Sequence, residues 1–302
     1  MTTADGAAIA VDARAKINLA LHVTGRRGDG YHLLDTLVTF AAFGDRLTFT
    51  AADADRFTLS GRFADAVPRG DDPDRGNLVL KARNLLREHA EAEGLSATPV
   101  HIHLEKQLPP ASGIGGGSAD AAATLRGLAR FWRLPGEIPA SLALSLGADV
   151  PMCLAGKPLF ARGIGEALTP ATDFPALFLV LVNPLHEVAT PAVFAALEQC
   201  DNPPVLSDAA MPRRAEDWLG LIKRARNDLQ LPASRIAPVI HAVIDALAAT
   251  DAELVRMSGS GATCFGLYPD LATAEKAATR LAAAFPDWFV VATPTLVAGD
   301  AA

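Results

Sequence analysis

A glycine-rich segment at residues 109–120, PPASGIGGGSAD, restricts the possible folds and functions of this chain more than any other part of it. Four of the five residues at 113–117 are glycine, so several backbone N–H groups can turn toward one point. A strand pattern at 100–104 precedes the segment, and a helical pattern at 125–132 follows it. Free N–H groups and the helix dipole both attract anions at a helix N-terminus. The segment therefore predicts a phosphate-binding loop.

Two common phosphate-binding patterns do not match this segment. The P-loop pattern G-x-x-x-x-G-K-[ST] needs a lysine after the glycines, and none follows here. The dinucleotide pattern G-x-G-x-x-G matches Gly113 and Gly115 but has Ser118 at its third position. It also lacks a ribose-binding acid in the expected βαβ unit. A purely structural glycine turn before a helix stays open as an alternative.

The composition limits the class of protein. A chain of 302 residues that is 50% hydrophobic can form two domains or one large α/β domain. A net charge of -7 without long basic runs argues against nucleic-acid partners. We find neither a signal-peptide pattern at 1–12 nor an apolar run of the roughly 18 to 20 residues that a membrane span needs. Cys153, Cys200 and Cys264 form no C-x-x-C pair and suit a reducing compartment, so we expect a cytoplasmic protein.

Strand and helix patterns mix along the chain without regular βαβ alternation, which predicts an α+β fold. Strand patterns occupy 13–23, 33–43, 45–59, 100–104, 178–182, 263–268 and 289–291, and helical patterns occupy 77–93, 139–146, 216–225, 238–249 and 272–284. Residues 203–213 read as a polar, proline-bearing linker. Alternation within 13–23 predicts that Lys16, Asn18 and His22 share one strand face, as in the wall of a site.

The glycine-rich segment resembles the phosphate loop of the GHMP kinases, the superfamily of galactose, homoserine, mevalonate and phosphomevalonate kinases. That loop has proline, three variable residues, glycine, a hydrophobic residue, glycine, and small residues ending in serine and alanine, which residues 109–119 match. Residues 13–19 (ARAKINL) and 257–264 (MSGSGATC) are similar to the two other superfamily motifs, which lie near the chain ends.

Further segments resemble one family of the superfamily, the kinases of 4-diphosphocytidyl-2-C-methyl-D-erythritol. These segments are 16–19 (KINL), 24–32 (TGRRGDGYH), 147–151 (GADVP), 162–166 (RGIGE) and 227–229 (NDL). They occur in the order of the family, so the match extends over nearly the whole chain. The resemblance implies ATP-dependent phosphorylation of the 2-hydroxyl of that substrate in the non-mevalonate isoprenoid pathway. It implies a small-molecule partner and Mg²⁺. Because the loop motif lacks an obvious carboxylate, we expect the ion to be held mostly by ATP and water.

The same resemblance implies a fold of two domains. The N-terminal, ATP-binding domain would span 1–157 and have the fold of ribosomal protein S5 domain 2. The C-terminal, substrate-binding domain would span 158–302 as an α/β sandwich. The oligomeric state does not follow from the sequence.

For catalysis, the resemblance implies that Asp149 takes the proton of the hydroxyl group while Lys16 lies beside it. An ammonium group stabilises a neighbouring carboxylate and the negative charge that develops during the reaction. From the residues alone, Asp149 could equally form a turn after a helix, and Lys16 could be an ordinary solvated lysine.

For binding, the resemblance implies that ATP contacts the whole loop: Pro109, Pro110, Ala111, Ser112, Gly113, Ile114, Gly115, Gly116, Gly117, Ser118 and Ala119. The Ser118 hydroxyl can cap the helix and also contact phosphate or Mg²⁺, whereas Asp120 favours the helix dipole without a chemical role. The implied substrate-binding residues are Asn18, Tyr31, His32, Thr190 and Phe194. Tyr31 would stack on the cytosine, His32 would hydrogen-bond its edge, and Phe194 would close its other face; a Tyr31–His32 core pair is the alternative.

The loop departs from the family pattern at three positions. Ala111 and Ser112 stand where glycines are usual and favour negative φ, and Ala119 lacks a hydroxyl group. We therefore expect altered ATP affinity with activity retained. The alternatives still open are a homoserine or mevalonate kinase, a non-catalytic nucleotide-binding relative, and an NAD-dependent oxidoreductase.

Overall fold

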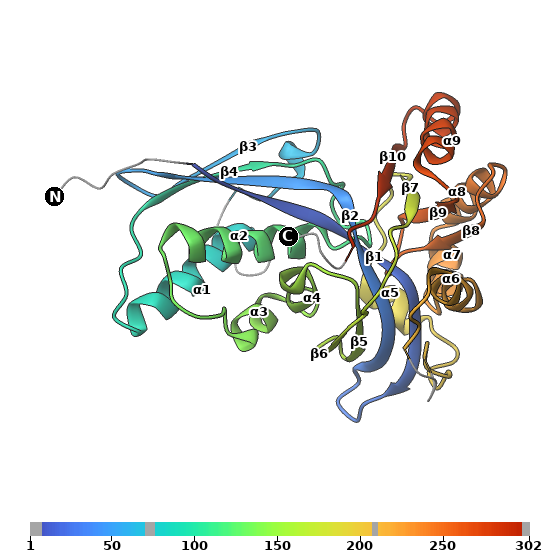
Figure 1. Ribbon diagram of the computed structural model, residues 1–302, viewed down its shortest axis with the longest axis horizontal. Coiled ribbons are helices and arrows are strands. Elements are labelled where there is room, and N and C mark those ends of the chain that lie inside the picture. The colour runs from blue at the N-terminus through green and yellow to red at the C-terminus, as the bar shows by residue number, and fades with distance from the viewer. Residues whose placement is uncertain (1–7, 70–75, 207–210, 298–302) are drawn as a thin grey trace.

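The computed structural model describes residues 8–69, 76–206 and 211–297. Two sheets lie next to each other, each with helices packed against it (Figure 1). Strands and helices are mixed as the α+β prediction requires. Within the described part of the chain, no helix is long and apolar enough to cross a membrane.

The first sheet is dominated by two long antiparallel strands, β1 (Ile9–Arg26) and β2 (His32–Ala51). β2 also pairs with β4 (Val100–Glu105) and β5 (Leu159–Gly163). The sheet is completed by β3 (Arg56–Ser60), which is parallel to β4, and by β6 (Ala167–Pro170), which is antiparallel to β5.

Helices cover one face of this sheet (Figure 1). They are α1 (Leu78–Ala92), α2 (Gly116–Phe131), α3 (Ala140–Leu146) and α4 (Val150–Ala155), and a short 3-10 helix, η1 (Ala64–Ala66), follows β3. The central helix α2 packs against β1, β2, α1 and α4. Its small buried residues Ala119, Ala121, Ala122 and Ala123 allow this close packing. The N-terminus of α2 is thereby fixed at the middle of the molecule.

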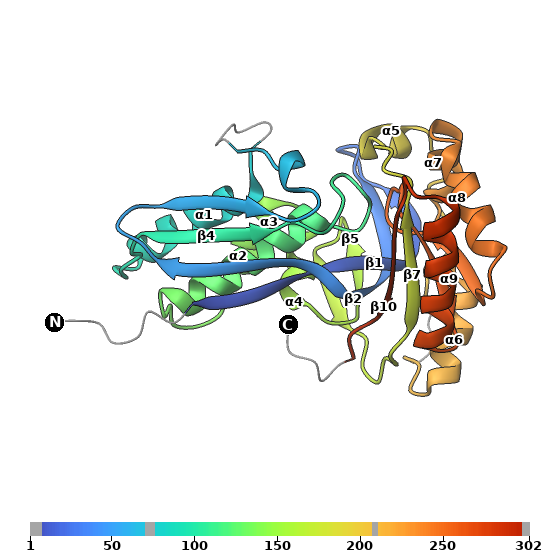
Figure 2. The same ribbon diagram turned by 90° about the horizontal axis from the view of Figure 1, so that it is seen from above.

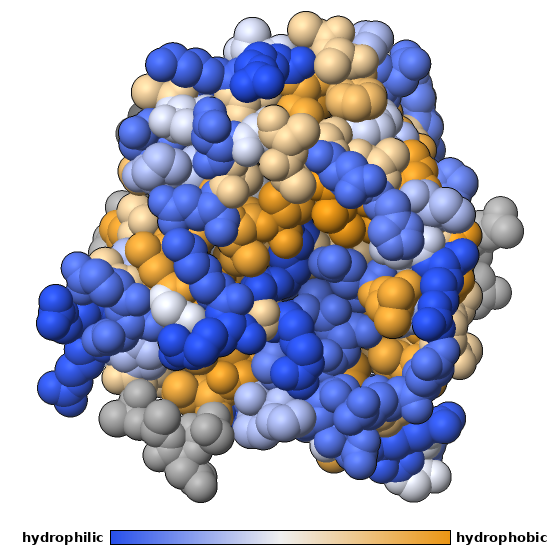
Figure 3. All heavy atoms as spheres, turned by 90° about the vertical axis from the view of Figure 1, so that its right-hand side faces the viewer, coloured by the Kyte–Doolittle hydropathy of each residue, from blue (hydrophilic) through white to orange (hydrophobic). Residues whose placement is uncertain are grey.

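The second sheet is antiparallel throughout, in the order β10 (Phe289–Pro294), β7 (Phe178–Asn183), β9 (Cys264–Tyr268) and β8 (Leu254–Met257). Its helices are α5 (Thr190–Ala195), α6 (Ala215–Arg224), α7 (Gln230–Ile236), α8 (Val239–Ala248) and α9 (Leu271–Ala284). Helices α8 and α9 pack on the sheet at the end of the molecule far from α1 (Figure 2). Viewed from this end, apolar side chains gather in the middle of a largely polar face (Figure 3).

The strand prediction was wrong around residue 44. The two strands predicted at 33–43 and 45–59 are one strand, β2, up to Ala51, and then the separate strand β3. β2 stays continuous through Gly44 because β1 pairs with it on both sides of that glycine. The sequence patterns also missed the short elements α4, α5, α7, β5 and β6, which have four to seven residues each. Elements of that length carry too few residues to show a period.

Two other sequence predictions concern connections and domains. The described parts of the linker, 203–206 and 211–213, contain no helix or strand, and residues 207–210 lie outside the described residues. The domain boundary between 157 and 158 stays a prediction. Strands β5 and β6 follow that boundary in sequence, yet they pair within the first sheet.

Candidate active site

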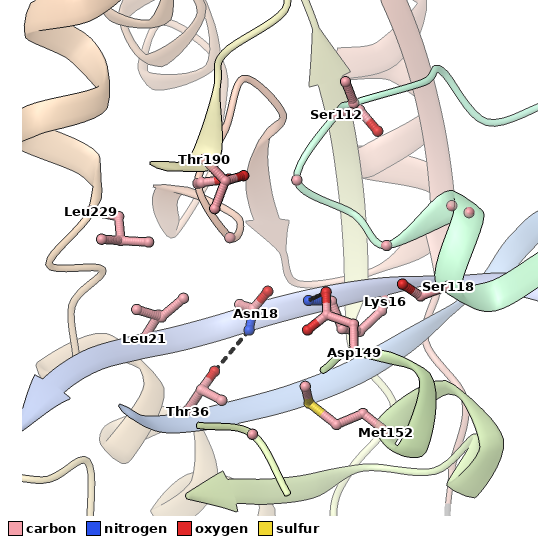
Figure 4. Close-up of a pocket in the computed structure, with 18 of the residues that line it drawn as sticks. Lys16, Asn18, Leu21, Thr36, Ser112, Ser118, Asp149, Met152, Thr190 and Leu229 are labelled. Carbon is pink, nitrogen blue, oxygen red and sulfur yellow. Dashed lines mark hydrogen bonds and ion pairs between the residues drawn. The ribbon is translucent and has the colours of Figure 1, made fainter. Parts of the chain in front are cut away.

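A cavity of about 500 Å³ opens between the two halves of the molecule, and we call it the loop cavity (Figure 4). It is lined by β1, β2, the segment 111–118, the residues around Asp149, the start of α5, and the turn at 259–260. The phosphate loop predicted at 109–119 therefore lies at a cavity that both halves of the chain form.

The phosphate loop has the geometry of an anion site. Gly115 precedes α2 with φ +65°, and the first helical bond runs from the Ala119 N–H to the Gly115 carbonyl. The N–H groups of Gly116, Gly117 and Ser118 consequently have no acceptor within the helix. All three residues line the loop cavity, where the helix dipole favours negative charge.

The predicted capping role of Ser118 is wrong. Helix α2 begins at Gly116, two residues earlier, so Gly115 occupies the capping position and Ser118 is the third residue of the helix. Glycine takes that position because the backbone there is left-handed. The Ser118 hydroxyl group is free for a ligand, and it faces Lys16 and Asp149 in Figure 4.

A second glycine loop, residues 257–262, braces the phosphate loop. The Ser258 hydroxyl accepts from the Asn18 N–H at 3.0 Å and donates to the Gly113 carbonyl at 3.1 Å. The Thr263 N–H donates to the Ser112 carbonyl at 3.1 Å, and the Lys16 N–H donates to the Ile114 carbonyl at 3.0 Å. The phosphate loop is thus fixed from both sides by the backbone of distant segments.

The predicted ATP-binding residues divide into two groups. Seven of them line the loop cavity, namely Ala111, Ser112, Gly113, Gly115, Gly116, Gly117 and Ser118. The other four, Pro109, Pro110, Ile114 and Ala119, are not among its lining residues. The side chains of Ile114 and Ala119 pack in the core, so a hydroxyl group at position 119 would not simply project into this cavity.

Ala111 adopts φ +46°, contrary to the expectation of a negative φ. Alanine is strained in this region by about 1 to 2 kcal/mol, whereas glycine is not. Because glycine also costs roughly 0.5 to 1 kcal/mol of unfolded-chain entropy, we expect Ala111→Gly to raise the free energy of unfolding by about 0.5 kcal/mol. Urea unfolding measures this change, and a loss of about 1 kcal/mol, as for glycine in ordinary backbone, would contradict it.

Lys16 and Asp149 form an ion pair at the loop cavity. The Lys16 ammonium lies 2.7 Å from Asp149 Oδ2, although the two residues are far apart in the sequence. Lys16 extends from β1 with a side chain that is 4% exposed, while that of Asp149 is 38% exposed. Asp149 immediately precedes α4 but does not cap it, so its carboxylate remains available toward the cavity.

The predicted polar face of β1 is only partly correct. Lys16, Asn18 and Leu21 line the loop cavity, whereas His22 does not. The pairing of β1 with β2 shifts between Asn18 and Ala20, which inserts an extra residue and reverses the alternation of faces. His22 instead contacts the Pro203 carbonyl at 2.8 Å through Nδ1, and burial lowers its pKa.

Asn18 presents an acceptor to the loop cavity. Its Nδ2 donates to the Thr36 hydroxyl at 2.8 Å (Figure 4), and that hydroxyl in turn donates to the Ala20 carbonyl at 2.6 Å. Asn18 Oδ1 is buried and has no hydrogen-bond partner among the described residues. A buried acceptor without a partner is costly, so a ligand donor at this position would be favourable.

A second cavity of about 790 Å³ lies beside the β1–β2 hairpin, and we call it the hairpin cavity. Its lining includes the predicted substrate-binding residues Tyr31, His32, Thr190 and Phe194. Tyr31 is 62% exposed, which rules out the core-pair alternative for it. The two cavities have seven lining residues in common, among them Ser118, Asp149 and Phe194, and they therefore adjoin at the Lys16–Asp149 pair.

The aromatic groups of the hairpin cavity are arranged for recognition of a planar ligand. The His32 and Phe194 rings stack with centroids 5.0 Å apart and an interplanar angle of 25°. Burial and then the neighbouring Arg26 lower the pKa of His32, so its imidazole is neutral at pH 7 and offers one donor and one acceptor. Thr190 is the first residue of α5, and its hydroxyl lies 2.7 Å from the Ser260 hydroxyl of the second glycine loop.

Sequence reasoning missed two features of the site. Arg26 lines the hairpin cavity beside His32, and its place in the TGRRGDGYH segment was the available signal. Asp120, expected to act only on the helix dipole, is instead buried and paired with Lys106. Lys106 also pairs with Asp45, which is distant in the sequence, so no short motif could indicate this cluster.

Metal-binding groups are sparse in the described part of the chain. No cluster of three or more His, Cys, Asp and Glu side chains there could hold a metal ion. Asp149 is the carboxylate that both cavities share.

Comparisons with known families match both halves of the chain. The model of the GHMP kinases N terminal domain matches residues 77–157, and that of the GHMP kinases C terminal matches residues 209–287. The chain is 57% identical over 299 residues to the 4-diphosphocytidyl-2-C-methyl-D-erythritol kinase of Rhizobium etli, and the match covers 98% of both chains. It is 55% identical to the enzyme of the same name from Sinorhizobium medicae, with 96% of each chain covered.

Solved structures give a consistent result. A crystal structure of 4-(cytidine 5'-diphospho)-2C-methyl-D-erythritol kinase matches with a TM-score of 0.79 and 34% identity, covering 95% of this chain and 99% of that one. A homoserine kinase from Cytophaga hutchinsonii matches with a TM-score of 0.64 and 17% identity, covering 98% of this chain and 99% of that one. The second match shows a shared fold alone.

Proposed function

Because the chain belongs to the 4-diphosphocytidyl-2-C-methyl-D-erythritol kinase family of the GHMP kinases, we propose an assignment of its cavity residues to the steps of that reaction. The chain is a small-molecule kinase. It phosphorylates the 2-hydroxyl of its substrate with ATP, giving the 2-phosphate and ADP in the non-mevalonate (methylerythritol phosphate) pathway. The cytoplasmic location stays a prediction from the sequence.

The observation that carries the assignment is the position of Asp149 where the two cavities adjoin. One cavity offers backbone N–H groups suited to phosphates, and the other offers aromatic rings suited to a base. A phosphoryl donor in the loop cavity and a cytidine-linked acceptor in the hairpin cavity would therefore meet at the Lys16–Asp149 pair. Such an arrangement positions both reactants for direct transfer.

The ATP phosphates bind to the phosphate loop in this assignment. A Cβ added to Gly113 would lie 2.6 Å from the Ser258 carbonyl oxygen, so this position needs glycine. The N–H groups of Gly116, Gly117 and Ser118 at the start of α2 suit the close approach of phosphate oxygens. Mg²⁺ prefers oxygen ligands, so it would be held mainly by ATP and water, with the Ser118 hydroxyl and Asp149 as the nearby protein oxygens. When bound, Mg²⁺ neutralises charge on the phosphates.

Proton transfer and charge stabilisation fall to the ion pair. The Asp149 carboxylate accepts the proton of the 2-hydroxyl as the oxygen of that group bonds to the γ-phosphorus and the bond to ADP breaks. The Lys16 ammonium, 2.7 Å from Asp149, orients the carboxylate and stabilises the negative charge on the transferring group. Water is restricted on the Lys16 side because that side chain is buried.

The cytidine end of the substrate lies in the hairpin cavity. Tyr31 covers one face of the cytosine, Phe194 the other, and the neutral His32 imidazole bonds to its edge. Because His32 and Phe194 stack on each other in this structure, the base enters by separating or extending that stack. Asn18 Oδ1 and the Thr190 hydroxyl contact the polar middle of the substrate. In the same assignment, residues 1–157 form the ATP-binding domain and residues 158–302 form the substrate-binding domain.

Replacing Tyr31 by alanine tests the cytosine assignment. Stacking of a base on an aromatic ring contributes about 1 to 3 kcal/mol, so the dissociation constant for cytidine diphosphate should rise roughly 5- to 150-fold. Calorimetric titration measures this change. Arg27→Ala is the control in the same hairpin, because Arg27 itself does not line the cavity, and its partner Asp29, which does, keeps its bond from the Tyr31 N–H at 3.2 Å. Unchanged affinity in Tyr31→Ala would contradict the assignment.

A coupled assay of ADP release tests the reaction itself. Wild-type protein with ATP and Mg²⁺ should release ADP with 4-diphosphocytidyl-2-C-methyl-D-erythritol and not with homoserine or mevalonate. Release with either of the latter two substrates would favour another GHMP kinase activity. Cytidine diphosphate binding without any ADP release would instead indicate a non-catalytic protein.

A further inference from the structure

Three buried charged residues lie directly beneath the phosphate loop. The Lys106 ammonium is 2.5 Å from Asp45 Oδ2 and 2.6 Å from Asp120 Oδ2, and all three residues are at most 4% exposed. The cluster touches the loop itself, because a Cβ added to Gly116 would lie 3.3 Å from the Lys106 ammonium.

The cluster connects both ends of the loop to the first sheet. Asp45, on β2, accepts at Oδ1 from the N–H groups of Gln107 and Leu108 at 2.5 and 2.7 Å, where the chain enters the loop. Asp120 lies on α2, where the chain leaves it. Lys106 joins the two carboxylates, so the entry to the loop and the first turns of α2 are held in one arrangement.

Burial of these charges is poorly explained by stability alone. Removing charged groups from water costs several kcal/mol for each, and apolar residues in their place are often equally stabilising or more so. A cluster with excellent geometry fixes the relative positions of the segments that it joins. The segments joined here are those that aim the free N–H groups of Gly116, Gly117 and Ser118.

The cluster also contains more acidic groups than basic groups. One ammonium faces two carboxylates, and Asp120 Oδ1 has no hydrogen-bond partner among the described residues. Burial, opposed by Lys106 and reinforced by Asp45, raises the pKa of Asp120 to about 8. Below that pH Asp120 holds a proton and the cluster is neutral; above it, the cluster carries one negative charge beneath the loop.

We propose that Lys106, Asp45 and Asp120 are positioning residues that pre-organise the phosphate loop for ATP. This inference rests on the proposed function, because it takes the loop as the ATP phosphate site. A pre-formed loop binds its anion without first having to be ordered, which improves affinity. The neutral form of the cluster favours ATP, and the negative form opposes its phosphates.

The first test compares Asp45→Asn with Asp55→Asn. Asp55 is a matched control because it also pairs with a cation, Arg87, and accepts a backbone N–H, that of Val100, at the opposite end of β4. In Asp45→Asn the hydrogen bonds to Gln107 and Leu108 lose their charged acceptor, so we expect the dissociation constant for ATP to rise about tenfold. The KM for the cytidine-linked substrate should stay within about twofold. ATP binding is measured by calorimetry without acceptor.

The second test follows ATP affinity from pH 7 to pH 9 in wild type and Asp120→Asn. Asparagine imitates the protonated carboxyl group and cannot ionise. The wild-type dissociation constant should rise about fivefold more over this range than that of the variant. Asp120→Asn also serves if Asp45→Asn fails to fold.

Two outcomes would overturn the proposal. One is an equal effect of Asp45→Asn and Asp55→Asn on ATP affinity, and the other is the same pH dependence in wild type and Asp120→Asn. Failure of the proposed function is a separate result, because wild type would then bind ATP without releasing ADP in the presence of the cytidine-linked substrate.

Discussion

Asp149→Asn is expected to lower kcat by about 10²- to 10⁴-fold, the usual contribution of a positioned general base. Asparagine keeps the size of the side chain and can still accept a hydrogen bond from Lys16, which is 2.7 Å from the carboxylate. It cannot take the proton of the acceptor hydroxyl. Because Asp149 does not cap α4, the substitution removes no helix-capping bond. The loss should therefore fall on the chemical step and not on folding.

The measurement is ADP release at saturating ATP and acceptor, together with separate titrations of ATP and cytidine diphosphate. Asp12→Asn is a suitable control, because Asp12 is also on the first half of the chain, pairs with Arg14 and has a side chain 44% exposed, against 38% for Asp149. The control should retain wild-type kcat. Equal kcat values for Asp149→Asn and wild type would contradict the general-base assignment, whatever the binding titrations give.

Lys16 and Asp149 also show how far local sequence patterns reach. Alternation in β1 correctly predicts a strand around Lys16, and the helix that ends at Gly147 is correctly placed before Asp149. Neither pattern brings the two residues together, since the contact depends on how α4 packs under the first sheet. Only the family resemblance connected them, and the 2.7 Å ion pair agrees with that connection.

Features that depend on packing could not be predicted from local patterns. The residues of β1 from Ala15 to Val23 are buried on both faces, so hydrophobicity gives no sign of the register shift that turns His22 away from the loop cavity. Asp120 looked like an ordinary acid near a helix start. Its burial follows from Lys106 and Asp45, which only the folded chain brings beside it.

The phosphate loop, by contrast, was predictable in place but not in detail. Its position between a strand and a helix follows from the periodic segments on either side. The left-handed conformation at Ala111 and the helix start at Gly116 do not, because the second glycine loop fixes the backbone at Ser112 and Gly113. Tertiary contacts therefore decide which loop residues face the ligand.

Gly113→Ala should disrupt this arrangement strongly. Gly113 has φ +76°, and an added Cβ would lie 2.6 Å from the Ser258 carbonyl oxygen and 2.7 Å from that of Gly261. Both neighbours are backbone atoms, so the two glycine loops must move apart. We expect a loss of about 3 kcal/mol in the free energy of unfolding, above the 1 to 2 kcal/mol of backbone strain alone. The dissociation constant for ATP should rise at least about tenfold, because the displaced loop no longer aims its N–H groups together.

Gly94→Ala separates strain from displacement. Gly94 has φ +72°, nearly that of Gly113, but a Cβ there meets nothing within 4 Å. This variant should lose only the strain energy, about 1 to 2 kcal/mol, and bind ATP as wild type does. Urea unfolding and ATP calorimetry compare the two variants directly. If Gly113→Ala prevents folding, Ser258→Ala replaces it, since it removes the hydroxyl between Asn18 and Gly113 without adding an atom. Wild-type ATP affinity in both loop variants would show that contact between the two glycine loops does not set the phosphate site.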